Sequence, residues 1–291
     1  MAVMYFAKIN INRDIYEVYG EQRDYQKELY RIYEAINEEV SVDVEGPESF
    51  GAMYTFASVN KDPDKLYITG RLIRVEPGAN TTFDRTKHDV IDTFDENKAS
   101  YITFFVDIST EIIGFVAKRD FGFRMFLSAF SRLLSRAANT EYEVYLISDK
   151  REFKSKVSGF RTIQSMTITA VPPNNDKELF DDLFGISRAD AKAIGLGKLK
   201  ESLHPRDKDG LHVTDQLWQK VDYSITGGGT TSVRGISIDS DEPVTISSDE
   251  DAPYKKAIQD DDKDNQEAIR FHGEQEVGKI IAMREWQARK E

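Results

Sequence analysis

The chain has 291 residues, of which 40% are hydrophobic and 31% charged, so it is long enough to bury a core as one large domain or two smaller ones. It contains no cysteine, which excludes disulfide bonds, cysteine-ligated zinc, iron–sulfur clusters and cysteine nucleophiles. The formal net charge of −12 argues against indiscriminate binding to nucleic acid, so any contact with DNA has to be local.

The first residues lack the charged start and apolar middle of a signal peptide, and no run approaches the ~20 apolar residues that cross a bilayer. We therefore expect no membrane span and a cytoplasmic location, which the absence of cysteine also fits.

In chain order, residues 3–11 predict a first strand. Apolar residues at three- and four-residue steps between Tyr25 and Val40 predict an amphipathic helix. Residues 52–59 and 66–75 predict a hairpin, because strong turn formers separate them. Residues 81–100 are mixed and polar, and predict a loop with a helical turn.

The stretch from Ala99 to Val171 has the densest apolar runs and the densest positive charge, and we expect the rest of the fold to form around it. Its first strand, at residues 101–106, is apolar on both faces, as in a central strand covered on two sides. Its main helix has an apolar stripe that predicts burial. The predicted elements are a strand pair at 101–106 and 112–117, a helix at 121–138, a strand at 142–147, a helix at 149–158 and a strand at 163–171.

The remainder predicts a smaller helical part with short helices at 176–184, 187–194, 196–203 and 214–221, followed by a flexible hairpin around the glycines of 227–229. Residues 239–264 hold ten Asp or Glu against three Lys, which predicts a poorly ordered acidic linker. The predicted fold class is α+β, with a mixed, mostly antiparallel sheet and packed helices. The predicted domains are an α+β core at 1–172, a helical and hairpin domain at 173–238, the acidic linker at 239–264 and a C-terminal helix at 265–291.

The most informative charge feature is a positive island in this acidic chain. Between Ala117 and Arg161 there are ten Lys or Arg against five Asp or Glu, a local balance of +5. One interpretation is a solvated helix face and an exposed turn. The other is a patch that binds phosphate backbones or an acidic partner. The candidate nucleic-acid contacts are Lys118, Arg119, Arg124, Arg132, Arg136, Lys150, Arg151, Lys154, Lys156 and Arg161.

A search for catalytic motifs yields no catalytic residue, cofactor or metal site. The glycine-rich 227–235 segment lacks the Gly-Lys-Ser/Thr ending of a P-loop. An EF-hand aligned on Gly210 places Pro205 and Gln216 where carboxylates are required. The four histidines show no metal-ligand spacing, although catalytic groups also assemble in space. Two alternatives stay open. One is a nuclease-like group of three carboxylates with a lysine, formed by Glu141, Glu143, Asp149 and Lys150. The other is the stacking of nucleic-acid bases on Trp218 and Trp286.

Two short motifs carry a family resemblance that covers about a quarter of the chain. Glu111-Ile112-Ile113-Gly114-Phe115-Val116 and Phe160-Arg161-Thr162, followed by Met166-Thr167-Ile168-Thr169-Ala170, resemble steps in RexA-like phage-exclusion proteins of lambdoid prophages. KwaB-like components of the Kiwa defence system are similar in the same broad plan. The resemblance implies a cytoplasmic, DNA-associating homo-oligomer in phage exclusion or antiviral defence, with no catalytic residue. The acidic tail and the negative charge depart from that pattern.

Two functions follow as hypotheses. The first is a non-enzymatic phage-exclusion or antiviral protein that associates with DNA through the positive island. In this hypothesis the protein is a homo-oligomer, and a second protein of a defence system is a further partner. The alternative is a protein-binding module or inhibitor that acts through the acidic C-terminal segment. A hydrolase with a spatially assembled site is the third and least favoured hypothesis.

Overall fold

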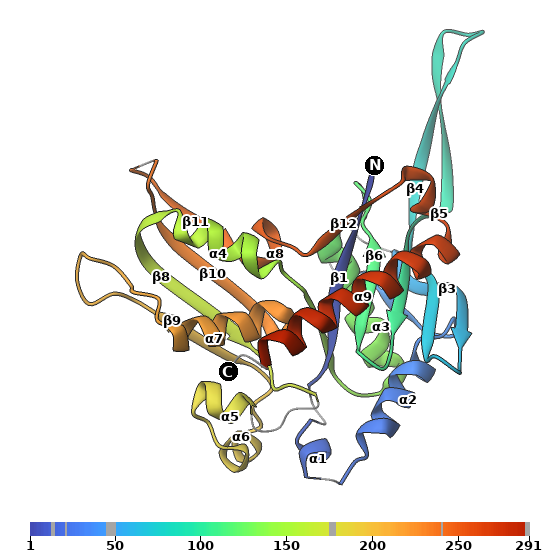
Figure 1. Ribbon diagram of the computed structural model, residues 1–291. Helices are drawn as coiled ribbons and strands as arrows, with labels where there is room; N and C mark the ends of the chain where they lie inside the picture. Colours follow the sequence, from blue (N-terminus) through green and yellow to red (C-terminus); the bar gives the residue numbers. More distant parts are fainter. Residues whose placement is uncertain (13–14, 21, 45–50, 175–178, 240, 289–291) are drawn as a thin grey trace.

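The computed structural model describes residues 1–12, 15–20, 22–44, 51–174, 179–239 and 241–288, and within these ranges the side chains of 188 and 284–288 are left aside. It has an α+β fold in which two antiparallel sheets are combined with helices, as the sequence predicts (Figure 1). No helix in these ranges has both the length and the apolar character needed to span a membrane.

The larger sheet has eight strands in the order β12-β1-β6-β5-β4-β3-β2, and β7 also pairs with β1. Strands β12 and β7 follow one another along the same edge of β1, at Ala2–Tyr5 and Ala7–Ile11. The strands are β1 (Ala2–Ile11), β2 (Ser41–Asp43), β3 (Met53–Asp62), β4 (Tyr67–Asp84), β5 (Asp89–Asp107), β6 (Ile112–Val116), β7 (Tyr142–Leu146) and β12 (Lys255–Ile258).

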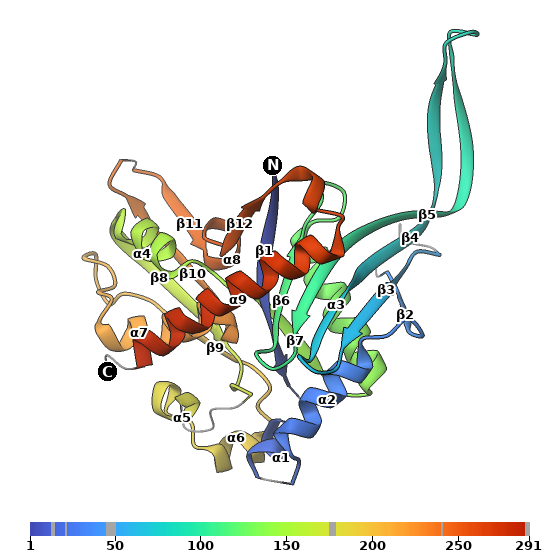
Figure 2. The same ribbon diagram turned by 45° about the vertical axis from the view of Figure 1, so that its right-hand side comes forward.

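Helices cover both faces of this sheet, which confirms the two-sided burial predicted for residues 101–106. Ile102 and Phe104 of β5 pack into one cluster with α2 (Tyr25–Ala35) and α3 (Phe123–Ala138), whereas Phe105 packs into another with α9 (Gln266–Ala288). Alternate residues of a strand point to opposite faces, so one strand serves both clusters. Figure 2 shows α9 lying across the sheet.

Two glycines lie in tight packing. A Cβ on Gly273 of α9 would lie 2.3 Å from a ring carbon of Phe105, so glycine is needed there. A Cβ on Gly114 of β6 would lie 2.4 Å from Cε of Met4 on β1, so the end of that flexible side chain would have to move. The Ile-Gly-Phe motif is therefore a point of tight packing between neighbouring side chains of the sheet.

The smaller sheet has the order β11-β10-β8-β9, and a separate apolar cluster joins it to α4 and α7. Its elements are β8 (Phe160–Ala170), β9 (Leu199–Leu203), β10 (Gly229–Ser237), β11 (Pro243–Ser247), α4 (Lys150–Ser158) and α7 (Asp215–Tyr223). Short helices complete the chain: α1 (Ile15–Tyr19), α5 (Leu179–Phe184), α6 (Arg188–Ile194) and α8 (Ser248–Asp251), with a π-helical turn at Ser224–Gly228 and a 3₁₀ turn at Asp260–Asp262.

The sheets divide the chain differently from the predicted boundaries. Strand β8 precedes residue 172 yet pairs with β9 and β10, and β12 returns from the acidic segment to the larger sheet. Residues 239–264, predicted as a linker, therefore contribute a strand to each sheet. The segment 196–203, predicted as a helix, ends in the edge strand β9. Where the sequence predicts a flexible hairpin around the glycines of 227–229, the chain forms the π-helical turn at Ser224–Gly228, which leads into β10.

The largest difference from the sequence prediction lies between residues 78 and 95. Instead of a loop with a helical turn, β4 and β5 continue past the other strands and pair from Gly78–Asp95 to Asp84–Asp89. We call this projecting ribbon the arm, and Figures 1 and 2 show it extending away from both sheets. Its residues face solvent on both sides, so it lacks the buried face that makes a strand recognisable in a sequence.

Candidate functional site

The ten predicted phosphate contacts lie in two groups on different parts of the fold. The first group is on the connection after β6 and along α3, and the second is on α4 and the start of β8. The first comprises Lys118, Arg119, Arg124, Arg132 and Arg136; the second comprises Lys150, Arg151, Lys154, Lys156 and Arg161.

The second group is largely engaged with carboxylates. Lys150 and Lys154 both form ion pairs with Asp222 of α7, and Lys154 Nζ also lies 4.7 Å from the ring centroid of Trp218. Lys156 pairs with Glu152 at 3.1 Å, and Arg161 pairs with Asp241 at 2.8 Å. Each of these cations would have to leave its partner before it could bind a phosphate.

In this second group, Arg151 is exposed and has no ion pair with any residue in the described ranges. In the second group, four cations are therefore held by carboxylates, and only Arg151 of α4 can bind a phosphate without first losing an ion pair to a described residue.

The first group is more open. Arg119 and Arg136 are exposed, and neither forms an ion pair with a residue in the described part of the chain. Arg124 pairs with Glu250, but its side chain is 65% exposed. Lys118 pairs with Asp264 at 2.6 Å, and its Nζ lies 3.6 Å from the ring centroid of Tyr101.

A groove of about 610 Å³ lies where β1 begins and brings two members of the first group together. Lys118 and Arg119 line it, and so does Lys263, which the sequence analysis had assigned to the acidic linker. The rings of Tyr5 and Phe123, with centroids 5.7 Å apart, also line it. The full lining is Met1, Ala2, Val3, Tyr5, Val116, Ala117, Lys118, Arg119, Gly122, Phe123, Asp260 and Lys263.

The N-terminus of α3 adds positive potential at this groove. Its N-cap is Gly122, which provides no capping side chain, and its first turn contains no acidic residue. The first N–H groups of a helix have no partner within the helix, and the helix dipole is positive there, so this end favours an anion. With Lys118 and Arg119 beside it, the groove has the chemistry of a phosphate site.

Two carboxylates reduce the positive charge that the lysines of this groove offer to a phosphate. Asp264 holds Lys118, and Asp260 pairs with Lys263 at 2.8 Å. The hydrogen bond from Lys263 lowers the pKa of Asp260, and the same contact raises the pKa of Lys263, so both groups are charged at neutral pH. A bound phosphate would compete with Asp260 and Asp264 for the lysines, whereas Arg119 is available at once.

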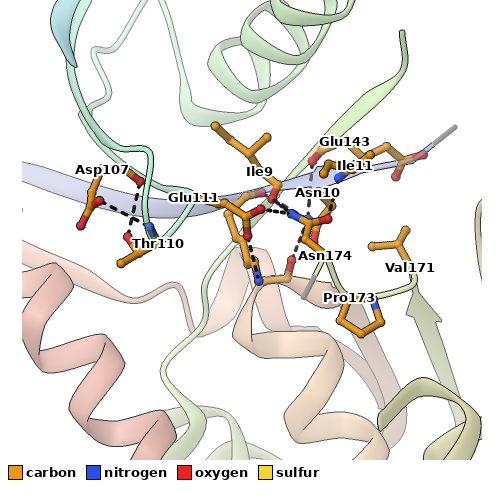
Figure 3. Close-up of polar contacts among 12 residues, drawn as sticks. Ile9, Asn10, Ile11, Asp107, Thr110, Glu111, Glu143, Val171, Pro173 and Asn174 are labelled. Atoms are coloured by element: carbon orange, nitrogen blue, oxygen red, sulfur yellow. Dashed lines mark hydrogen bonds and ion pairs between the residues drawn. The ribbon is translucent and has the colours of Figure 1, made fainter. Parts of the chain in front are cut away.

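A second polar cluster lies at the other end of β1, where the chain passes between the sheets (Figure 3). Asn174 donates from Nδ2 to Glu111 Oε1 at 2.5 Å and to Ile9 O at 2.9 Å, and its Oδ1 accepts from Ile11 N at 2.7 Å. Lys8 Nζ lies 3.5 Å from Glu111 Oε2. These contacts hold the edge of β1 against the chain that leaves β8.

Glu111 is fully buried, and its backbone has the unusual φ of 60°. Burial raises the pKa of this carboxyl, against the opposing effects of Lys8, Asn174 and Tyr25. Burial and the neighbouring Glu111 in turn raise the pKa of Tyr25. Because the Glu111 and Lys8 side chains are only 2% and 14% exposed, the cluster is closed to a substrate and serves to join the sheets.

The nuclease-like group does not form one site. Asp149 caps α4 by accepting from Arg151 N and Glu152 N, and Lys150 binds Asp222. Glu143 instead pairs with Lys198 at 2.9 Å. Within the described ranges no group of three or more His, Cys, Asp or Glu side chains is arranged to hold a metal ion.

Comparison with curated proteins finds no match. The family model described as Domain of unknown function (DUF4747) matches residues 3–274, which include the arm, the buried cluster, and both sheets and the groove apart from Met1 and Ala2. The chain therefore belongs to the DUF4747 family.

Proposed function

We propose that this chain is a non-enzymatic, cytoplasmic protein of phage exclusion or antiviral defence, which associates with DNA as a homo-oligomer. In this proposal, DNA phosphates bind in the groove at the N-terminus of α3. The observation that carries it is the convergence of Lys118, Arg119 and Lys263 with an uncapped helix N-terminus in one groove. The resemblance to RexA-like and KwaB-like proteins supplies the defence setting.

The proposed interface is narrower than the ten residues predicted from the sequence. Lys150, Lys154, Lys156 and Arg161 are paired with carboxylates, so binding a phosphate would cost them an existing ion pair. Arg119 has no such cost, and the dipole of α3 adds to its field. We therefore assign the largest single contribution to Arg119.

The groove favours a single strand or a strand end over the face of a duplex. Its volume of about 610 Å³ is within the range of small-ligand sites. Aromatic rings beside cations are typical of sites that bind single strands, where bases stack and phosphates pair. Tyr5 and Phe123 are both partly buried, so their exposed edges form an apolar floor beside the cations.

Fluorescence anisotropy with labelled single-stranded and duplex DNA tests the proposal. We expect binding at about 50 mM salt that weakens steeply by about 200 mM, because each neutralised phosphate releases counterions. Arg119→Glu should reduce the affinity at least ~10-fold through lost attraction and new repulsion. The matched control is Arg151→Glu, which makes the same change at an exposed arginine of α4 that has no ion pair within the described ranges, and it should leave the affinity nearly unchanged.

Equal losses in the two variants would contradict the groove as the interface and would favour a diffuse positive surface. Absence of binding at low salt would contradict DNA association altogether.

A further inference from the structure

The arm is a two-stranded ribbon that carries large apolar side chains into solvent. Phe83, Val90 and Phe94 are 59%, 59% and 71% exposed. A two-stranded hairpin alone in water is at best marginally stable, and exposed apolar patches on a soluble protein mark interaction surfaces. The arm therefore has the character of a docking element.

The strand register places most of this apolar surface on one face. The pairs Ala79–Phe94, Thr81–Asp92 and Phe83–Val90 are cross-strand partners at alternate positions, so their side chains point to the same side. We call this side the apolar face. Ile91 pairs with Thr82 and lies on the opposite side, which is otherwise polar.

Charge is distributed unevenly along the arm. Arg85 and Lys87 lie in the turn at the tip, between Asp84 and Asp89. The root, where the arm joins the sheet, has the carboxylates of Glu76, Asp95 and Glu96 against one cation, Lys98. Among the described residues, Lys87 and Glu96 have no ion-pair partner. The tip of one arm is therefore complementary to the root of another that runs in the opposite direction.

We propose that the arm is the self-association surface of this protein, with the arms of two copies packed antiparallel through their apolar faces. This inference rests on the self-association in the proposed function. A two-fold axis at the Thr81–Asp92 pair makes positions at equal distances from it meet. The axis lies between the two apolar faces, so each strand of one arm lies over the same strand of the other arm in the opposite direction. Phe94 then faces the second copy's Val90, Phe83 faces the second copy's Ala79, and Glu96 faces the second copy's tip on the side of Lys87, in a closed isologous contact.

DNA is a poor occupant for this surface. Residues 76–98 contain six Asp or Glu against three Lys or Arg, so the arm is net negative and repels a phosphate backbone. A second copy fits both the apolar face and the charges of the arm. Its apolar face covers the apolar face of the first copy, and the cations at the tip of each arm come close to the carboxylates at the root of the other.

Sedimentation equilibrium of the full chain tests the proposal. The unaltered protein should be a dimer that dissociates on dilution. Phe94→Ser should weaken the dimer at least ~10-fold, because Phe94 is the most exposed aromatic side chain of the apolar face and loses its burial against the second copy. Ile91→Ser, on the opposite side of the same ribbon, should leave the dissociation constant unchanged. Thermal melts establish that the body stays folded in both variants.

A charge exchange tests the antiparallel arrangement. Lys87→Glu alone should weaken the dimer several-fold, and Lys87→Glu with Glu96→Lys should restore it, because the exchanged charges meet again across the two-fold axis. Failure of the second change to restore the dimer would overturn the antiparallel register.

Asp92 provides a test of opposite sign. It lies near the centre of the apolar face and accepts from Thr81 Oγ1 at 2.5 Å. Two such carboxylates approach one another across the two-fold axis, so Asp92→Asn should tighten the dimer several-fold. An unchanged or weaker dimer would place Asp92 away from the axis and overturn the arrangement.

The outcomes separate this inference from the self-association that it presupposes. A monomer at every concentration would overturn both. A dimer that survives Phe94→Ser and Phe83→Ser would leave self-association standing and would exclude the arm as its surface.

Discussion

A lysine–carboxylate ion pair lies near each end of β1, and the two pairs differ in how far they are exposed to solvent. Near its start, Lys118 and Asp264 meet at the open groove with side chains 28% and 37% exposed. In its second half, Lys8 and Glu111 meet between the sheets with side chains 14% and 2% exposed. The residue chemistry is similar, so burial decides what each pair does.

An exposed pair can exchange its partner, because water and ions compensate either charge when the pair opens. A buried pair cannot, because each charge has lost its hydration and depends on its neighbours. The difference assigns ligand binding to the groove and structural support to the buried cluster. Four predictions, each with its own control, test that assignment.

The largest expected effect comes from removing one partner at the buried end. At a pH above the raised pKa of Glu111, Lys8→Met should lower the free energy of unfolding by about 3 kcal/mol or more, because it leaves the Glu111 carboxylate buried without a cation. Lys118→Met makes the same change at the exposed end and should cost no more than about 1 kcal/mol. Urea unfolding of both variants measures the difference.

A double variant, Lys8→Met with Glu111→Gln, should recover part of the loss, since no uncompensated charge then remains. Similar losses for Lys8→Met and Lys118→Met would show that exposure does not distinguish the two ends.

The next largest effect concerns Asn174. Asn174→Ala removes the acceptor of Ile11 N and the donor to Ile9 O and Glu111, all of which are buried. Unsatisfied buried polar groups cost about 1–3 kcal/mol each, so we expect a loss of about 2 kcal/mol or more in the free energy of unfolding. Asn12→Ala is the control: its amide makes a longer contact to Glu143, at 3.4 Å, and the change should cost less. Equal losses would show that the Asn174 contacts carry no special weight.

The buried end should also respond to pH. Burial raises the pKa of Glu111 above its ordinary 4.5, so the folded protein takes up this proton at a higher pH than the unfolded chain does. The stability contributed by this group is therefore gained as pH falls through the raised pKa, is complete below about 4.5, and is lost as pH rises.

Unfolding of the unaltered protein and of Glu111→Gln at several pH values between about 8 and 5 isolates this contribution, because the other titrating groups are common to both. The free energy of unfolding of the unaltered protein, relative to Glu111→Gln, should increase as pH falls. The opposite slope would mean that Lys8 outweighs the cost of burial.

The comparison also shows what a sequence reveals and what it hides. The apolar run of β5 and the stripe of α3 were predictable, because burial imposes a spacing on the sequence. Phe126, for example, stacks on Phe115 with ring centroids 4.0 Å apart. The Lys8–Glu111 pair has no such signature, because Lys8 lies on β1 and Glu111 in the distant turn between β5 and β6, and each is an ordinary charged residue in a linear sequence.

The positive island could also be predicted, because a local excess of Lys and Arg is visible in the sequence. The carboxylates that pair with these cations could not be predicted. Asp222, Asp241, Glu250 and Asp264 lie far along the chain and fold back onto its cations. The acidic segment seemed a linker because it holds ten Asp or Glu against three Lys, and most of the cations that its carboxylates contact lie far away in the sequence. The alternative function, a protein-binding module that acts through the acidic C-terminal segment, therefore cannot be tested simply by deleting residues 239–291. The deletion would also remove β12 and α9, which complete one of the apolar clusters with Ile258, Ile269, Val277 and Ile280.

The smallest expected effect on stability lies at the exposed end, where it should appear instead in binding. Asp264→Asn keeps the shape of the side chain and removes the carboxylate that holds Lys118. The free energy of unfolding should change by less than about 1 kcal/mol. The affinity for single-stranded DNA should rise several-fold at low salt, because Lys118 can then bind a phosphate without leaving a partner.

Asp241→Asn is the matched control for this last variant. It removes the same charge and frees Arg161 on the smaller sheet, away from the groove, so any effect of net charge alone appears in both variants. A selective gain for Asp264→Asn assigns the phosphate contact to the groove, since only there does releasing a cation add to the field of α3. Equal gains would mean that the whole acidic surface, rather than the exposed end of β1, limits DNA binding.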